Sequence, residues 1–66
     1  MEKGQILEFT IEDMSQEGKG IGKADGFAVF VEGAVVGDKV RVQLQKVKKR
    51  YGFGKLLEIL EESPDR

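Results

Sequence analysis

The chain contains 66 residues, with 11 Lys and Arg, 12 Asp and Glu, a formal net charge of −1, and neither Cys nor His. This length allows one domain with a small core, and the absent residue types exclude disulfides, thiolate metal sites and histidine acid–base chemistry. No apolar run approaches the ~20 residues of a membrane span and no signal-peptide pattern is present, so we expect a cytoplasmic protein without membrane contact.

Residues 5–13 are predicted to form the first strand, because apolar and polar side chains alternate along them. Leu7, Phe9 and Ile11 share one parity, so they should face the core from a half-buried strand. Met14 breaks the alternation, which indicates either a bulge or the end of the strand.

A hairpin is predicted next, with strands at residues 20–24 and 27–31. The Asp-Gly pair at 25–26 separates these strands, and it favours a type I′ turn because both central residues need positive φ. A two-residue loop fixes the register of a hairpin, so Ala24 should pair with Phe27 and the other residues should follow in step.

This register divides the hairpin into two faces. Phe27, Val29 and Val31 share one face with bare glycines on the partner strand, and we assign it to the core because large apolar side chains need burial. Phe30 and Lys23 then lie on the opposite face, which we expect to be exposed.

The next strand is predicted after a turn-rich connection at residues 32–38. Residues 39–45 alternate cleanly between inward apolar and outward polar side chains. The parity flips at 46–47, which predicts a bulge or bend there, and residues 48–50 are expected to form a loop.

The apolar residues near the end of the chain fit two structures. A strand over 51–60 is the main prediction, a helix over 55–62 is the alternative, and Ser63 and Pro64 would end either one. The pattern thus predicts five strands and no convincing helix. When such strands close into a barrel, each buries one face and no strand edge is left exposed. We therefore predict an all-β domain, a small five-stranded, OB-like antiparallel Greek-key barrel over residues 5–61.

Positive charge is concentrated in one part of the sequence. Residues 39–55 contain seven cations and no acid, whereas residues 1–38 contain three cations and eight acids. Tyr51 and Phe53 directly follow the densest run of cations. Cations for phosphates beside aromatic rings for bases are typical of single-strand nucleic-acid binders. Salt screens charges beyond ~10 Å, so the distant acids do not contradict this hypothesis.

Less specific interpretations also remain open for these residues. The cations could form a solvated strand face that prevents edge-to-edge aggregation, and Phe53 could belong to the core. Residues 18–23 lack the spacing and the Ser or Thr of a phosphate-binding loop, so their lysines are expected only as point charges for a polyanion. The candidate nucleic-acid-binding residues are Lys19, Lys23, Phe30, Arg41, Lys46, Lys48, Lys49, Arg50, Tyr51, Phe53 and Lys55.

No catalytic or metal-binding residue is predicted. Glu8 and Glu12 fall on the solvent-facing parity of a strand, and no acidic spacing matches a calcium loop. Ser15 and Ser63 lie in turn contexts in a chain without His or Cys, so no nucleophile–base pair can be proposed. We expect this chain to bind and not to catalyse, with no cofactor of its own.

The ordered set of motifs resembles the TRAM domain over residues 5–61. It runs from Ile-Glu-Asp-Met and Glu-Gly-Lys-Gly-Ile-Gly through Asp-Gly-Phe-Ala-Val-Phe-Val and Glu-Gly-Ala-Val-Val-Gly-Asp-Lys-Val to Lys-Val-Lys-Lys-Arg-Tyr-Gly-Phe-Gly-Lys-Leu. The sequence is most similar to the N-terminal TRAM module of bacterial RNA 5-methyluridine methyltransferases. In that family the basic final hairpin falls on Lys46, Lys48, Lys49 and Arg50, and the aromatic strand on residues 51–54.

The resemblance implies a non-catalytic module that delivers rRNA or tRNA to an S-adenosylmethionine-dependent uridine methyltransferase, and we expect this segment to be a monomer. It also implies that an iron–sulfur cluster, the S-adenosylmethionine fold and a catalytic cysteine lie beyond this segment, with residues 62–66 as the start of the linker. Two alternatives stay open. One is a free-standing TRAM RNA-binding protein or RNA chaperone, and the other is a barrel that docks an acidic partner protein.

Overall fold

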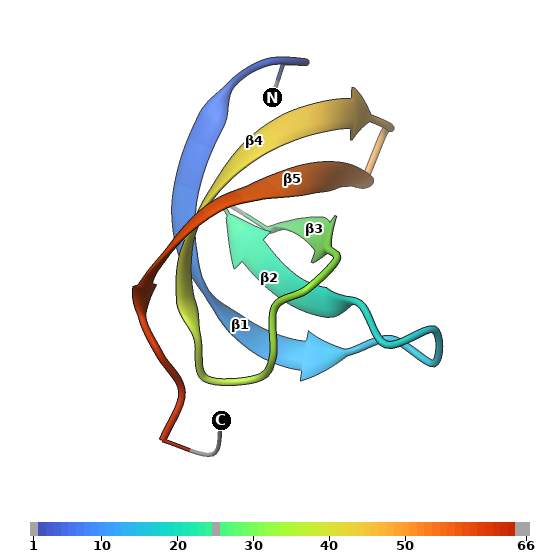
Figure 1. Ribbon diagram of the computed structural model, residues 1–66. Helices are drawn as coiled ribbons and strands as arrows, with labels where there is room; N and C mark the ends of the chain where they lie inside the picture. Colours follow the sequence, from blue (N-terminus) through green and yellow to red (C-terminus); the bar gives the residue numbers. More distant parts are fainter. Residues whose placement is uncertain (1, 25, 65–66) are drawn as a thin grey trace.

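The computed structural model describes residues 2–24 and 26–64, and these residues form a closed five-stranded barrel (Figure 1). The strands are β1 Ile6–Met14, β2 Gly20–Ala24, β3 Phe27–Val31, β4 Lys39–Val47 and β5 Tyr51–Glu61. Their order around the barrel is β1-β2-β3-β5-β4. The predicted all-β barrel is confirmed, and β5 occupies the residues for which a helix was the alternative.

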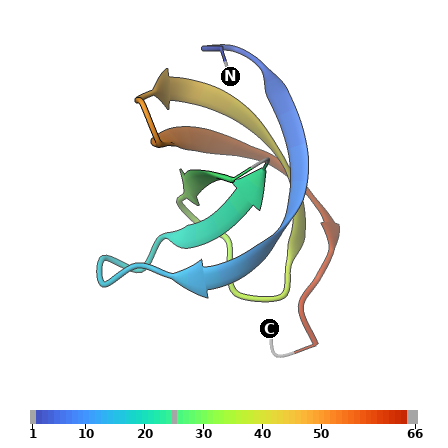
Figure 2. The ribbon, with the colours of Figure 1, turned by 180° about the vertical axis from the view of Figure 1, so that it is seen from behind.

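One pair of strands departs from the predicted antiparallel arrangement. The pairs β1–β2, β1–β4, β2–β3 and β4–β5 are antiparallel, whereas β3 and β5 are parallel. The chain leaves β3, crosses to β4 and returns as β5 beside β3 (Figures 1 and 2). The register of β3 and β5, from Ala28–Tyr51 to Val31–Gly54, runs in the same direction along both strands. This pair closes the barrel.

The β2–β3 hairpin has the register that its two-residue loop predicts. Ala24 pairs with Phe27, and the ladder continues in step to the pair of Gly20 with Val31. Gly26 has a φ of +78°, in the left-handed region that a type I′ turn requires. The first turn residue, Asp25, lies outside the described residues.

The core contains the side chains that the alternation patterns assign to it. Its buried members are Phe9, Ile11, Val29, Val31, Ala34, Val40, Val42 and Leu44, with Leu7 and Phe27 partly buried against them. The bare glycines of β2 have a packing role, because the Phe9 ring fills the space that a Cβ at Gly22 would occupy. The inward faces predicted for β1, β3 and β4 are therefore confirmed.

Bulges explain where the simple alternation fails. The β1–β2 register shifts between Ile11 and Asp13, so Glu12 is an extra residue, and β1 ends at Met14. On β4 the shift lies between Leu44 and Lys46, one residue before the predicted parity flip. On β5 a further shift beside Leu57 turns consecutive apolar residues to different faces, which accounts for the ambiguous parity of that strand.

Asp38 joins the β3–β4 connection to the end of the chain. It is fully buried, and its Oδ2 accepts a hydrogen bond from the Val35 N–H at 3.1 Å while its Oδ1 accepts one from the Ser63 N–H at 2.7 Å. Its carbonyl also accepts a hydrogen bond from the Ile11 N–H at 2.8 Å. A Cβ at Gly37 would lie 2.7 Å from the Ser63 hydroxyl, so this turn packs closely on the segment after β5.

Replacing Asp38 by Ala should lower the free energy of unfolding by about 2–3 kcal/mol, because two backbone N–H groups would lose their acceptor, one of them in a buried bond. Urea unfolding followed by circular dichroism measures this change. Asp13→Ala is the matched control, since its carboxylate accepts an exposed hydrogen bond from the neighbouring Met14 N–H, and we expect a change within about 0.5 kcal/mol. Equal stabilities of the two variants would contradict the anchoring role of Asp38.

Candidate nucleic-acid interface

The parallel β3–β5 pair gathers an aromatic cluster on the outside of the barrel. Phe30 on β3 lies opposite Phe53 on β5, and Tyr51 precedes Phe53 on the same outward parity. The ring centroids are 5.6 Å apart for Phe30 and Phe53, 6.0 Å for Phe30 and Tyr51, and 5.8 Å for Tyr51 and Phe53. We call these residues, Phe30, Tyr51 and Phe53, the aromatic cluster.

The aromatic cluster lies outside the core. Tyr51 is 42% exposed, Phe30 and Phe53 are half-buried, and all are absent from the group of side chains that pack on the core. The alternative in which Phe53 is a core residue is therefore excluded. Phe30 points away from the core, as expected, but it is only half-exposed because Tyr51 and Phe53 pack against its ring.

Two lysines flank Phe53. The Lys19 Nζ lies 5.3 Å from the Phe53 ring centroid, within range of a cation–π interaction. The backbone of Lys19 is held by Ser15, whose N–H donates to the Lys19 carbonyl at 2.8 Å and whose Oγ accepts from the Lys19 N–H at 3.0 Å. On the other side, Lys46 of β4 pairs with Phe53 across the β4–β5 ladder.

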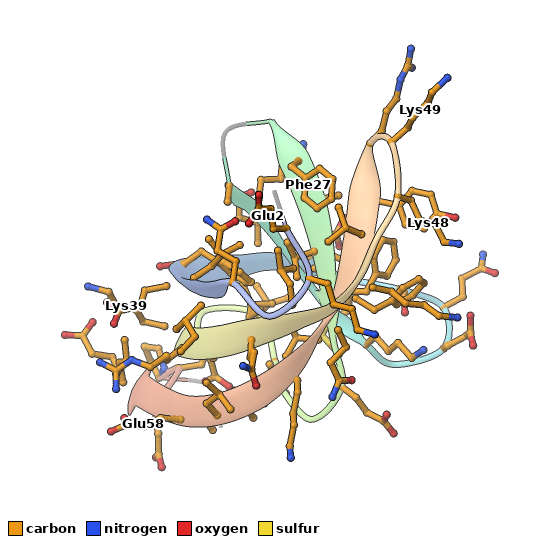
Figure 3. The ribbon with its side chains drawn as sticks, turned by 90° about the horizontal axis from the view of Figure 1, so that it is seen from above. Glu2, Phe27, Lys39, Lys48, Lys49 and Glu58 are labelled. Atoms are coloured by element: carbon orange, nitrogen blue, oxygen red, sulfur yellow. The ribbon has the colours of Figure 1, made fainter. Side chains whose placement is uncertain are left out.

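The β4–β5 turn supplies further positive charge. Lys48, Lys49 and Arg50 are exposed, and the Lys48 N–H donates to the Tyr51 carbonyl at 2.8 Å to close the turn. Figure 3 shows Lys48 and Lys49 projecting away from the barrel at this turn. The turn and the 15–19 loop extend from the same side of the barrel, with β3 between them (Figures 1 and 2).

A hollow of about 330 Å³ lies at the aromatic cluster, and sequence reasoning missed part of its lining. The lining residues are Lys19, Phe30, Glu32, Gln45, Lys46, Phe53 and Gly54. Glu32 directly follows β3 and Gln45 is the extra residue at the β4 bulge. No sequence pattern indicated a role for Glu32. The bulge predicted beside Gln45 could have indicated one for Gln45, because bulges re-aim side chains next to functional sites.

The structure does not bring every candidate residue to this surface. Arg41 lies nearer the opposite end of β4, roughly 16 Å of strand from Lys46, and its guanidinium is 2.9 Å from carboxylate oxygens of both Glu8 and Glu58. The structure therefore places Arg41 apart from the cations of the β4–β5 turn, contrary to their grouping in the sequence analysis.

Lys23, Lys39 and Lys55 also stand apart from the aromatic cluster to different degrees. Lys39 lies at the far end of β4, opposite Glu61. Lys23 lines a separate hollow with Phe30 and two acids. Lys55 lines a hollow that adjoins the first one and shares Glu32 with it.

The described residues contain no cluster of metal-ligating side chains. Residues 2–24 and 26–64 contain no group of three or more His, Cys, Asp and Glu side chains placed to hold a metal ion. Because the sequence has no cysteine, an iron–sulfur cluster does not fit this chain. In the same described ranges, no helix is long and apolar enough to cross a membrane.

The barrel and its outer surface define an OB-like domain, a class of five-stranded barrels whose loops and middle strands bind oligonucleotides or oligosaccharides. The family model of the TRAM domain matches residues 1–57. This chain therefore belongs to the TRAM domain family, and the resemblance found in its motifs is confirmed.

Similar proteins give this domain a context. An uncharacterized RNA methyltransferase of Halalkalibacterium halodurans is 45% identical over 64 residues, which are 97% of this chain and 14% of that protein. Another, from Clostridium acetobutylicum, is 47% identical over 66 residues, 100% of this chain and 14% of that protein. The chain thus spans about 14% of the length of the curated relatives it matches, in their N-terminal region.

A solved structure resembles most of this chain. The solution structure of a conserved protein of Methanococcus maripaludis superimposes with a TM-score of 0.81 at 40% sequence identity. The match covers 88% of this chain and 83% of that chain.

The outward position of the aromatic cluster predicts unequal costs for two similar substitutions. Phe30→Ala should lower the free energy of unfolding by about 1–2 kcal/mol, the scale of lost contacts with neighbouring rings. Phe9→Ala should lower it by about 3–5 kcal/mol, because Phe9 is buried and packs on Gly22. Thermal or urea unfolding measures both, and a larger loss for Phe30 would show that its face had been wrongly assigned.

Proposed function

We propose that this chain is an RNA-binding module that positions rRNA or tRNA for an S-adenosylmethionine-dependent uridine methyltransferase and takes no part in the chemistry itself. The observation that carries this proposal is the aromatic cluster, flanked by Lys19 and Lys46 and adjoined by the basic β4–β5 turn. OB barrels bind oligonucleotides on the face of strands 2–3 and on the 1–2 and 4–5 loops, and this surface uses β3 and the same two loops.

The chemistry of the surface suits a single-stranded or locally unpaired RNA segment. Exposed cations of the turn bind phosphates, while the faces of Tyr51, Phe30 and Phe53 offer stacking positions for unpaired bases. Bases inside a duplex are already stacked, so sequence-specific RNA recognition targets loops, bulges and ends. A module that binds such segments would hold the substrate near a modification site.

The relatives support a role within a larger enzyme. Those from Halalkalibacterium halodurans and Clostridium acetobutylicum carry the name RNA methyltransferase, and this chain matches about 14% of each. The chain lacks both Cys and His, so the reaction would belong to the remaining part of such a protein. The names of these relatives do not specify the methylated nucleoside, and uridine is our proposal.

A free-standing RNA-binding protein is the second candidate function. It is favoured by the Methanococcus maripaludis protein, because this barrel matches 83% of that chain. The same surface would then bind RNA with little sequence preference, as an RNA chaperone does. The native gene sequence on both sides of the region that encodes this chain separates the two candidate functions. An adjoining methyltransferase region supports a module of an enzyme, and stop codons at both ends of the region support a free-standing protein.

The cations of the β4–β5 turn should set the salt dependence of RNA binding. For Lys48→Ala/Lys49→Ala/Arg50→Ala, the slope of log affinity against log salt should fall by about 2, because each lost phosphate contact on a single strand removes ~0.7. Fluorescence anisotropy with a labelled single-stranded RNA across a salt series measures this slope. Arg41→Gln should keep the wild-type slope, because Glu8 and Glu58 already neutralise its guanidinium. An unchanged slope in the triple variant would overturn the assignment of the turn.

The aromatic cluster should contribute affinity that does not depend on salt. Tyr51→Ala and Phe30→Ala should each weaken RNA binding by about 5-fold or more, since stacking contributes ~1–3 kcal/mol per base. Their salt slopes should equal that of the wild type because no charge is lost. Leu57→Ala is the control, as it removes another exposed apolar side chain of β5, 43% exposed. Wild-type affinity in both aromatic variants would contradict stacking on this cluster.

A further inference from the structure

Glu32 is an unexpected residue on a surface that would bind phosphates. Of the described residues that line the aromatic hollow, Glu32 is the one acid, beside Lys19 and Lys46. A structural explanation would be an ion pair with one of these lysines. Within residues 2–24 and 26–64, however, the ion pairs shorter than 4.0 Å are those of Arg41 with Glu8 and Glu58. The Glu32 carboxylate is therefore exposed and unpaired in the hollow, where it repels phosphate.

Gln45 of β4 lines the same hollow. The bulge at Gln45 lies between the pairs Leu44–Gly54 and Lys46–Phe53, which breaks the alternation of β4 at the hollow. Glu32 and Gln45 also line the adjoining hollow of about 290 Å³ that contains Lys55. A carboxylate and an amide thus share the border between a hollow with aromatic walls and a hollow with a further cation.

These groups match the donors and acceptors of one base better than those of the others. A carboxylate only accepts hydrogen bonds, whereas the Gln amide also donates. Guanine presents two adjacent donors, N1–H and the 2-amino group, next to the acceptor O6. Uracil presents a single N3–H between two carbonyl oxygens, and in adenine and cytosine a ring acceptor lies next to the amino group. A carboxylate facing those edges would meet a repelling acceptor.

We propose that this hollow is a guanine subsite on the RNA-binding surface, an inference that rests on the proposed function. Glu32 accepts hydrogen bonds from N1–H and the 2-amino group, and the Gln45 amide donates to O6. The guanine ring packs against Phe30 and Phe53, while Lys19, Lys46 and Lys55 bind the phosphates on either side. Glu32 is then a specificity-determining residue, because it disfavours the backbone and favours one base.

The test compares short RNAs that differ at a single nucleotide. Anisotropy titrations would use a labelled seven-nucleotide oligouridine and its versions with a central guanosine, adenosine, cytidine or inosine. Wild-type protein should bind the guanosine RNA about 5-fold or more tightly than the uridine, adenosine and cytidine RNAs, since a good bidentate contact discriminates bases by ~1–3 kcal/mol. Inosine lacks the 2-amino group, so its RNA should bind with intermediate affinity.

Substitution of Glu32 should remove this preference without loss of general binding. Glu32→Gln should bring the affinities for guanosine and uridine RNAs within about 2-fold of each other, and should leave binding of oligouridine equal or tighter because a negative charge is lost. Glu61→Gln makes the same change in charge at the far end of β5, beside Lys39, and should keep the wild-type preference. Both positions are exposed, so both variants should fold.

The outcomes separate this inference from the function on which it rests. If the wild-type protein binds all these RNAs equally well, the guanine subsite is overturned and the RNA-binding function stands. If Glu32→Gln retains the guanosine preference, the role of Glu32 is overturned. If no RNA binds at low salt, the proposed function itself fails.

Discussion

The parallel pairing of β3 with β5 is the constraint on which both the core and the candidate site depend. Each antiparallel pair reverses direction, so the closed ring formed by the described strands, five in number, must contain a parallel pair. Where β5 runs beside β3, its inner face carries glycines at 52 and 54, because a Cβ at Gly54 would overlap Val42 of β4 and one at Gly52 would lie 2.6 Å from the Lys46 carbonyl of β4. The same alignment sets Phe30 beside Phe53. Closure of the barrel therefore builds the aromatic cluster.

The fold also sorts the charges of a chain whose net charge is only −1. Towards one end of β4, Glu8 and Glu58 surround Arg41, so this cation is neutralised locally. At the other end, the cations at 48–50 project from the turn beside the aromatic cluster. The domain extends 31 Å along its longest axis, which exceeds the Debye length of ~10 Å at 0.1 M salt. A polyanion near the turn is thus influenced by local cations more than by the net charge.

The sequence predicted what local rules determine. A two-residue loop set the β2–β3 register, and alternation identified the inward faces, because both depend on neighbouring residues. Bulges at Glu12, Gln45 and Leu57 and the burial of Asp38 depend on partners far along the chain, so no local pattern located them fully. For the site, the aromatic residues were identified as candidates, but the side occupied by Phe53 followed only from β5 pairing with both β3 and β4.

A guanine subsite would supply what phosphate contacts alone lack. Contacts to the backbone fix affinity and orientation but carry no sequence information, so a purely basic surface lets RNA slide from one register to the next. A guanine held by Glu32 and Gln45 would fix the register of the RNA on the protein. A nucleotide at a set distance along the RNA would then also have a fixed position. Delivery to an active site requires this placement more than it requires high affinity. The unpaired Glu32 carboxylate among lysines is the feature that distinguishes this surface from a purely basic patch.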